Sequence, residues 1–193
     1  MKRKTQKQTA SVPVKTGPFL RALSMSLVLI VSGLLWAGTA SATGKLKGQV
    51  LGGGAPIASS TVTLWAASAG EPKQLAQAKT GADGRFALSA AKAPGKDTIL
   101  YLVAKGGQPT ANTGSGDNPA IALLTVLGSK PPESVVINEM TTVASVWTNA
   151  QFFDGTAIKG NALGLKIAAD NVPNFVDLQS GGWGGCNPGP TQR

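Results

Sequence analysis

The sequence predicts a mainly β protein, in which a small antiparallel β-sandwich over residues 43–128 is followed by a short α-helical segment over residues 129–180. The first observation is that short runs of alternating apolar and polar residues recur from Lys45 onward, with Gly, Pro and Asp between them. The second is a change to helical spacing after Asn138. Residues 181–193 show no periodicity and are predicted to be a disordered tail.

The first 42 of the 193 residues have the three-part pattern of a secretory signal peptide. Ala22 to Ala42 carries no charge, and Ala40-Ser41-Ala42 has the small-x-small pattern that signal peptidases accept. We therefore expect a signal helix within residues 1–42, cleavage between Ala42 and Thr43, and export from a bacterial cell to the periplasm, the cell surface or the medium. An uncleaved membrane anchor is the alternative, because about 20 apolar residues span a bilayer, although serines within the run argue against it. The basic head consists of Lys2, Arg3, Lys4, Lys7, Lys15 and Arg21.

The charge of the chain is concentrated in this predicted signal. Six of the 18 basic residues but none of the nine acidic ones lie in residues 1–42, so the remainder carries 12 bases against nine acids. Those bases are spread singly, whereas a nucleic-acid footprint needs a cluster on one face, and no nucleic-acid partner is predicted. The chain has no His and one Cys, Cys186, which excludes Ser-His-Asp and Cys-His catalysis, most zinc sites and an intrachain disulfide.

The predicted strands show period-2 alternation or a continuous apolar run, except LAQAKT, which has small residues on both sides. In the first strand Leu46 and Val50 share one face, and in the second Val62 and Leu64 do. Residues 52–60, GGGAPIASS, are predicted to be a loop because they contain a Pro and three glycines. The predicted strands are KLKGQVL at 45–51, TVTLWAA at 61–67, LAQAKT at 75–80, DGRFALSA at 83–90, TILYLVAK at 98–105 and AIALLTVLG at 120–128.

The dipeptide Asp83-Gly84 predicts a tight turn between two of these strands, because Gly tolerates positive φ and Asp bonds its own backbone. Phe86 is expected to fill the sandwich after the turn. A catalytic or metal-binding role for Asp83 is not favoured, since no second carboxylate is close to it in the sequence.

This order of strands and turns resembles the carboxypeptidase regulatory-like domain, one of the transthyretin-like or prealbumin-like β-sandwiches. The resemblance covers residues 45 to about 107. It implies a non-catalytic spacer or binding unit of the kind found in exported proteins. The matching positions are Gly48, Pro56-Ile57, Val62, Leu64, Thr80, Asp83-Gly84, Phe86 and the strand ILYLVAKGG.

Two helices are predicted after the sandwich. The first covers residues 138–153, with Asn138 or Thr141 as its N-cap. The second covers residues 161–178 and is disturbed at Pro173. The apolar residues at helical spacing are Met140, Val143, Ala144, Trp147, Ala150 and Phe152 in the first, and Leu163, Ile167, Val172, Phe175 and Val176 in the second.

The helical segment also resembles an Ala-rich region of large bacterial exported proteins of unknown function. Those proteins continue past this point, so the chain is expected to be a shortened relative. Without further neighbours, Trp147, Phe152, Phe153 and Phe175 would be uncovered unless they pack on the sandwich or on another chain. The matching words are Asn138-Glu139, Thr141-Thr142-Val143-Ala144, Trp147, Gly164-Leu165 and Asn174-Phe175-Val176-Asp177.

Three groups of residues have both a reactive and a structural interpretation, and the structural one is favoured in each. Glu139 beside Thr141 offers a base and a nucleophile, but Asn and Glu are also what a helix start selects. Asp117 and Asn118 offer oxygen ligands, but Ca²⁺ needs six to eight. Lys45 offers an isopeptide crosslink, but the two last predicted strands contain no Asn. No catalytic, cofactor or metal site is predicted.

Aromatic side chains are the remaining candidates for a site. Trp65, Trp147 and Trp183 are able to stack on sugars. Trp65 and Trp147 lie in patterned elements and are expected in the core, whereas Trp183 lies between glycine pairs and is expected to be exposed. Trp183 is therefore the only binding residue predicted. Cys186 can pair with another chain, but a lone Cys without His is a poor catalyst.

These patterns predict an exported, non-catalytic β-sandwich module that serves as a structural, adhesion or binding component of the cell envelope or extracellular space. It is not expected to be an enzyme. Its partner is expected to be an envelope or extracellular component, and a membrane only if the signal is not cleaved. The alternatives are a small-ligand carrier, by analogy with transthyretin-like folds, and an accessory domain of an enzyme.

Overall fold

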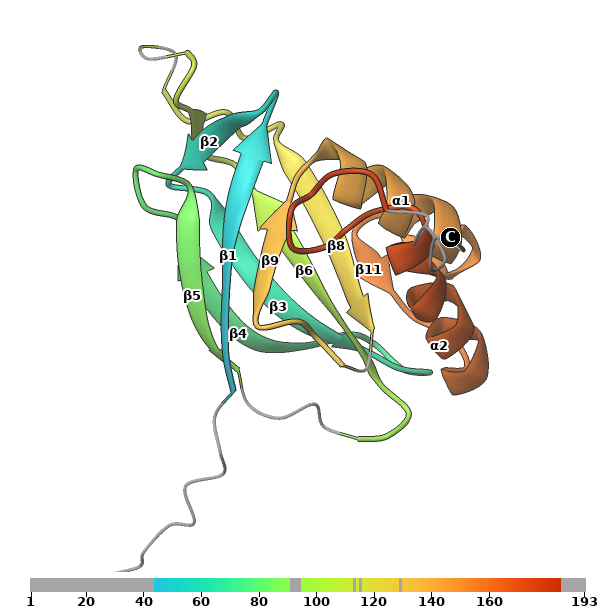
Figure 1. Ribbon diagram of the computed structural model, residues 1–193. Helices are drawn as coiled ribbons and strands as arrows, with labels where there is room; N and C mark the ends of the chain where they lie inside the picture. The colour runs from blue at the N-terminus through green and yellow to red at the C-terminus, as the bar shows by residue number, and fades with distance from the viewer. Residues whose placement is uncertain (1–43, 91–94, 113, 115, 129, 185–193) are drawn as a thin grey trace, which may run out of the picture. The chain divides into compact units, whose positions relative to one another are not determined.

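The computed structural model describes residues 44–90, 95–112, 114, 116–128 and 130–184, which all belong to one compact unit. It is mainly β, as predicted, and adds two short helices (Figure 1). The predicted signal helix lies outside the described residues. Within the described part of the chain, no helix is both long and apolar enough to cross a bilayer.

The elements follow the predicted order. The predicted strands correspond to β1, β3, β4, β5, β6 and β8, and the predicted helices to α1 and α2. The second helix is shorter than predicted, because residues 175–178 are not helical. The strands are β1 Gly44–Gly52, β2 Ala55–Ala58, β3 Thr61–Ala67, β4 Lys73–Lys79, β5 Arg85–Ala90, β6 Ile99–Lys105, β7 Gln108–Pro109, β8 Ala122–Gly128 and β9 Ser134–Ile137. After them come α1 Glu139–Asn149, the 3-10 turn η1 Ala150–Phe152, the hairpin β10 Phe153–Asp154 and β11 Ala157–Ile158, α2 Ala162–Asn171 and the 3-10 turn η2 Val172–Asn174.

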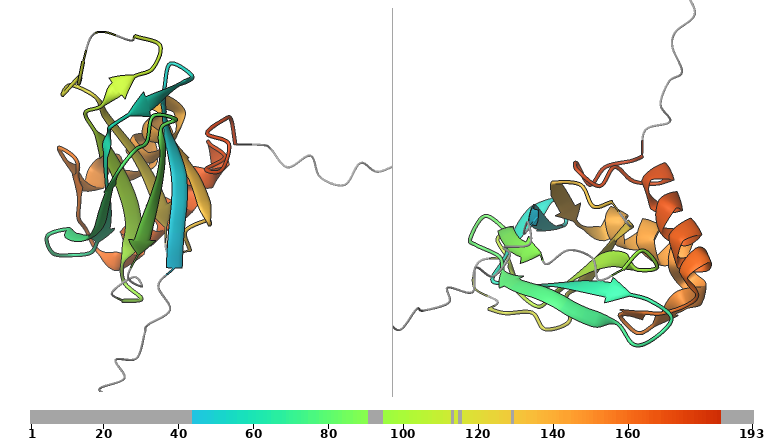
Figure 2. Two further views of the ribbon diagram at one scale, coloured as in Figure 1. Left: turned by 90° about the vertical axis from the view of Figure 1, so that its left-hand side faces the viewer. Right: turned by 90° about the horizontal axis from the view of Figure 1, so that it is seen from below.

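Two sheets face each other and enclose the core, and the helices lie along one side of the sandwich (Figure 1, Figure 2). The first sheet has the order β5-β1-β2-β7, with β9 also pairing with β1, and the second has the order β4-β3-β6-β8. Alternation buries Leu46 and Val50 of β1 and Val62 and Leu64 of β3, each at most 5% exposed, as predicted. Neighbouring strands are antiparallel except β1 and β9, which run parallel.

Asp83-Gly84 forms the predicted turn that leads into β5. Gly84 has a φ of +71°, and a Cβ at this position would lie 2.6 Å from the Val50 carbonyl oxygen. The Asp83 carboxylate accepts a hydrogen bond from the Arg85 backbone N–H at 3.0 Å, which is how Asp stabilises a turn. Phe86 follows with 5% of its surface exposed and fills the sandwich. These contacts give the dipeptide a structural role at a corner of the sheet.

Two strands lie where the sequence predicts other structures. Residues 52–60 are predicted to be a loop, but Ala55–Ala58 forms β2, which pairs with the end of β1 through a turn at Gly53 and Gly54, both with positive φ. A run of four residues that includes a Pro is too short to show alternation. The segment predicted to be helical begins instead with β9, Ser134–Ile137, which joins the first sheet. The sandwich therefore continues past its predicted boundary.

Helix α1 closes one edge of the second sheet. β8 is the last strand of that sheet, so the outward N–H groups of its backbone need partners other than a strand. The Leu124 N–H donates to Thr142 Oγ1 at 3.0 Å, and the Val126 N–H donates to Ser145 Oγ at 2.9 Å. Two hydroxyl groups of α1 thus take the place of a neighbouring strand.

We predict that Ser145→Ala lowers the free energy of unfolding by about 1–3 kcal/mol, because the buried Val126 N–H would lose its acceptor. Urea denaturation followed by circular dichroism measures the change. Thr148→Ala is the matched control, because the Thr148 hydroxyl bonds only to carbonyls of its own helix and to Asn149. Equal losses in the two variants would contradict the proposed role of Ser145 at the sheet edge.

Candidate functional site

Helix α1 buries its polar side and exposes its apolar side. Ser145 and Asn149 are completely buried, whereas Val143 is 63% and Trp147 is 74% exposed. The prediction that Trp147 lies in the core is therefore wrong. The edge of β8 requires hydroxyl groups, and at about 100° per residue a helix that turns Ser145 to the sheet turns positions two residues away from it to the opposite side.

Helix α2 exposes apolar residues in the same way. The helix contacts α1 and β8, and its buried residues include Ala168 and Ala169. Among the apolar residues whose spacing predicts this helix, Val172 is buried, but Leu163 is 70% and Ile167 is 56% exposed. The buried side of α2 is made by Leu165 and the two short Ala side chains, and Leu163 and Ile167 lie on the opposite, outer side.

The chain folds back on itself after η2. Val176 and Trp183 form an isolated antiparallel bridge, so residues 175–184 make a loop, which we call the Trp183 loop. The sequence predicts a disordered tail from residue 181, and for residues 181–184 this prediction is wrong. Their Gly-rich sequence has no periodicity, and the loop is held by backbone contacts that periodicity does not reveal. Residues 185–193, with Cys186, lie outside the described residues.

The Trp183 loop is attached to both the sandwich and α1. The Val136 N–H in β9 donates to the Leu178 carbonyl at 2.8 Å, and Asn138 Nδ2 donates to the Gly181 carbonyl at 2.9 Å. Asn138 is also the predicted N-cap of α1, and its Oδ1 accepts from the Thr141 N–H at 2.9 Å. One side chain therefore fixes both the start of the helix and the position of the loop.

The carboxylate of Asp177 stabilises the Trp183 loop through hydrogen bonds to other residues of the same loop. Asp177 accepts hydrogen bonds from the Gln179 N–H at 2.9 Å and from the Ser180 hydroxyl at 2.7 Å. These bonds lower the pKa of Asp177, and the bond from the Gln179 backbone contributes most. The folded loop thus favours the charged form of this side chain.

A groove of about 280 Å³ lies between α1 and the Trp183 loop, and we call it the apolar groove. None of the residues that line it is charged. Trp183 is 82% exposed, as predicted, and Phe175 is 47% exposed. The lining consists of Met140, Val143, Ala144, Trp147, Asn174, Phe175, Trp183 and Gly184.

The other residues considered from the sequence make structural contacts. Glu139, the candidate base, accepts from the Gly53 N–H in the β1–β2 turn at 2.7 Å. Asp117, the candidate calcium ligand, accepts from the Gly107 N–H and so fixes its own loop. Among the described residues, no three His, Cys, Asp or Glu side chains come close enough together to hold a metal ion.

No family profile and no curated protein matches the sequence. The structure is similar to part of the crystal structure of a 9R-lipoxygenase from Cyanothece PCC8801, with a TM-score of 0.32 and 18% sequence identity. The similarity covers 49% of this chain and 16% of the lipoxygenase chain. A similarity of this extent carries no information about activity.

We predict that acid loosens the Trp183 loop. Because the pKa of Asp177 is lowered in the folded protein, its carboxylate stabilises the loop fully above the ordinary carboxyl pKa of about 3.9. That contribution is lost as the pH falls through the lowered value of the folded state. The fluorescence of Trp183, obtained by subtracting a Trp183→Phe variant, should therefore change in acid.

The Asp177→Asn variant is the control for this prediction. It should show the altered Trp183 emission already at neutral pH and should not change further in acid. An emission that still follows the pH in this variant, as in the wild-type protein, would contradict the assignment to Asp177.

Proposed function

We propose that this chain is an exported, non-catalytic β-sandwich module that acts as a binding component of the bacterial cell envelope or the extracellular space. The observation that carries the proposal is the apolar groove, where Trp147, Phe175 and Trp183 lie exposed on one surface. The signal-like pattern of residues 1–42 supports export. The resemblance of residues 45–107 to carboxypeptidase regulatory-like domains supports a non-catalytic role.

The exposed apolar residues are concentrated in one part of the chain. Single apolar residues at a surface are ordinary, but all the large ones that are more than 40% exposed in the described chain fall between residues 143 and 183. A fully exposed aromatic side chain offers roughly 150–250 Å², and Trp147, Phe175 and Trp183 are about half to four-fifths exposed in one groove. Together they approach the size of the patches that mark interaction sites. The set is Val143, Val146, Trp147, Leu163, Ile167, Phe175 and Trp183.

The chemistry of the groove identifies the kind of occupant. The cores of protein interfaces are depleted of charge and enriched in Trp, Phe and Met, and the lining combines Trp147, Phe175 and Met140 without a charged residue. A standard interface buries about 800 Å² on each partner. We therefore take the occupant to be an uncharged, apolar surface of another envelope protein. A second copy of this chain is the other outcome to be tested.

The two Trp residues are expected to supply most of the binding free energy. Interface hot spots are enriched in Trp and lie at the centre of the contact, where truncation costs about 2 kcal/mol or more. Trp147 and Trp183 approach the groove from α1 and from the Trp183 loop, so a partner side chain that enters it contacts both.

We predict that replacing Trp147 and Trp183 by Ser weakens association more than tenfold while leaving the fold intact. Sedimentation velocity of the purified protein detects self-association. To detect a different partner protein, the purified chain is used to capture envelope components, and the captured protein is identified. Its affinity for the wild-type chain and for the Trp variant is then measured with both proteins purified. Leu163→Ser with Ile167→Ser is the matched control, because it removes exposed apolar area outside the groove lining. The proposal would be overturned if the wild-type protein stays monomeric and captures the same envelope components as the Trp variant.

Export is tested separately by mass spectrometry of the protein from its native host. We predict a mature N-terminus at Thr43, because the basic head, the uncharged run and Ala40-Ser41-Ala42 direct cleavage after Ala42. Replacement of Ala40 and Ala42 by bulky residues should leave an uncleaved chain in the membrane fraction. A wild-type protein that retains Met1 in the cytoplasm would contradict export.

A further inference from the structure

The outer face of the second sheet carries a second groove, on a different surface from the apolar groove. Directly paired residues of neighbouring strands share a face of the sheet. Trp65 of β3 pairs with Tyr101 of β6, and their rings stack with centroids 6.5 Å apart. Thr63 of β3 pairs with Val103 of β6, and because Val62 and Leu64 face the core, these residues face outward. Trp65 lies on the same outer face and is only partly buried, so the prediction that it lies in the core is wrong.

A β-bulge gives this face its polar side chains. Thr63 pairs with Gln77 of β4 and Trp65 pairs with Gln74, although the two Gln residues are three positions apart. In a regular strand, residues at that spacing point to opposite faces. The register shift between Leu64 and Trp65 leaves an extra residue in β4 and brings both amides to the outer face. Bulges of this kind re-aim side chains and occur often beside functional sites.

The groove on this face has a volume of about 240 Å³, and we call it the sheet groove. The Thr63 side chain is mostly buried and the Gln74 and Gln77 side chains are exposed, and none of the three forms a side-chain hydrogen bond within the described residues. Because these polar groups line the groove and are not used by the protein itself, they are available to a ligand. The lining consists of Thr61, Thr63, Trp65, Gln74, Gln77, Val103, Lys105 and Thr156.

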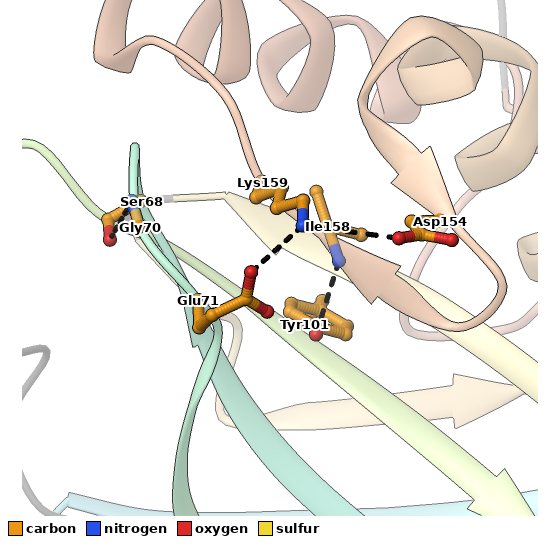
Figure 3. Close-up of polar contacts among 7 residues, drawn as sticks. All are labelled: Ser68, Gly70, Glu71, Tyr101, Asp154, Ile158 and Lys159. Carbon is orange, nitrogen blue, oxygen red and sulfur yellow. Dashed lines mark hydrogen bonds and ion pairs between the residues drawn. The ribbon is translucent and has the colours of Figure 1, made fainter.

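The hairpin β10–β11 brings Thr156 to the sheet groove and is fixed over the end of Tyr101. The Ile158 N–H donates to the Tyr101 hydroxyl at 3.4 Å, and Lys159 Nζ lies 2.8 Å from a carboxylate oxygen of Glu71 (Figure 3). The Gly160 N–H donates to the Ser68 carbonyl at 2.9 Å. Burial raises the pKa of Tyr101, so its hydroxyl stays neutral. The groove is therefore bounded by a fixed hairpin rather than by a free loop.

We propose that the sheet groove binds a neutral carbohydrate, one sugar ring at a time. A sugar ring has an apolar C–H face, which suits Trp65, and a rim of hydroxyl groups that both donate and accept hydrogen bonds. Gln74 and Gln77 each offer a carbonyl acceptor and an NH₂ donor, and Thr63 adds a hydroxyl. Pockets for drug-sized ligands are about 300–1,000 Å³, so a groove of about 240 Å³ suits a single ring of a longer chain.

The charges of the lining argue against the alternative ligands. Lys105 is the only charged residue among those that line the sheet groove, and it lies exposed at the end of β6. A phosphate or sulfate site would need several cationic groups. A site that binds a protein surface would be expected to have more apolar residues than the one Val and one Trp in this groove. Neutral hydroxyl-rich rings fit the mixture of aromatic, amide and hydroxyl groups.

The test is titration calorimetry of the purified full-length protein with neutral oligosaccharides, using hexamers of cellulose, chitin, β-1,3-glucan and starch as probes. We expect at least one series to bind. Trp65→Ala should weaken that binding more than tenfold, and Gln77→Ala should weaken it several-fold. Thr63→Val keeps the shape of the side chain and removes only the hydroxyl, so it separates a lost contact from a folding defect. Circular dichroism confirms that each variant is folded.

The apolar groove provides the matched control for this experiment. Trp183→Ala removes an exposed Trp elsewhere and should leave sugar binding unchanged, and Trp65→Ala should leave association through the apolar groove unchanged. Failure of one proposal is therefore distinguishable from failure of the other. Binding of none of the four probes would overturn the carbohydrate assignment. Binding that Trp65→Ala and Thr63→Val both leave unaltered would also overturn it.

Discussion

The hydrogen bonds from the outer backbone edge of β8 to the hydroxyls of Thr142 and Ser145 determine how the C-terminal part of the protein is arranged. An unpaired strand edge that is buried needs acceptors for its N–H groups, and α1 supplies them from one side of the helix. Because Thr142 and Ser145 lie one turn apart, that side must face the sheet along its whole length. Val143 and Trp147, each two residues from Ser145, then point to the opposite side of α1, away from the core. The exposed apolar surface is thus a direct consequence of how the sheet edge is satisfied. A helix with apolar residues toward β8 would have buried Trp147 but left the Leu124 and Val126 N–H groups without acceptors.

A few side-chain hydrogen bonds also explain why the Trp183 loop keeps its shape without periodic structure. Asn138 accepts a hydrogen bond from the first turn of α1 and donates one to the Gly181 carbonyl, so a single amide connects the helix start with the loop. The Asp177 carboxylate supplies a second attachment within the loop. Gly181 has a φ of +70°, and a Cβ there would come within 2.6 Å of the Asn138 amide, so only Gly allows this approach. Both walls of the apolar groove therefore depend on one Asn side chain, and a movement of the loop would change the position of Trp183 relative to Trp147.

The sequence predicts structures that depend on neighbouring residues in the chain, and it does not predict those that depend on a contact with a distant strand. The alternation of Leu46 with Val50 predicts β1, and the N-cap Asn138 and the helix-disturbing Pro173 predict the helical segment, because each follows from local chemistry. The exposed state of Trp183 follows from its glycine neighbours. The burial of α1 cannot be predicted in the same way, because Val143 and Trp147, the large apolar residues at helical spacing, face outward while Ser145 and Asn149 are buried. Only the hydrogen bonds that the distant strand β8 needs explain this arrangement. The bulge in β4 is hidden for a similar reason: Gln74 and Gln77 occupy opposite faces in any regular strand, and only the pairing with β3 places them together.

The sandwich and the helical segment are joined by more contacts than their separate sequence patterns suggest. β9 adds to the first sheet from beyond that boundary, α1 closes the edge of the second, and the hairpin that follows α1 rests on the Tyr101 hydroxyl and brings Thr156 to the sheet groove. Cutting the chain after β8 would remove these contacts, exposing the backbone of one strand and opening one end of the sheet groove. The apolar groove would lose every residue of its lining, because all of them come after residue 139. Both proposed binding surfaces therefore require the helical segment to be folded against the sandwich. The sandwich of residues 44–128 expressed alone would be expected to lack one surface completely and the other in part.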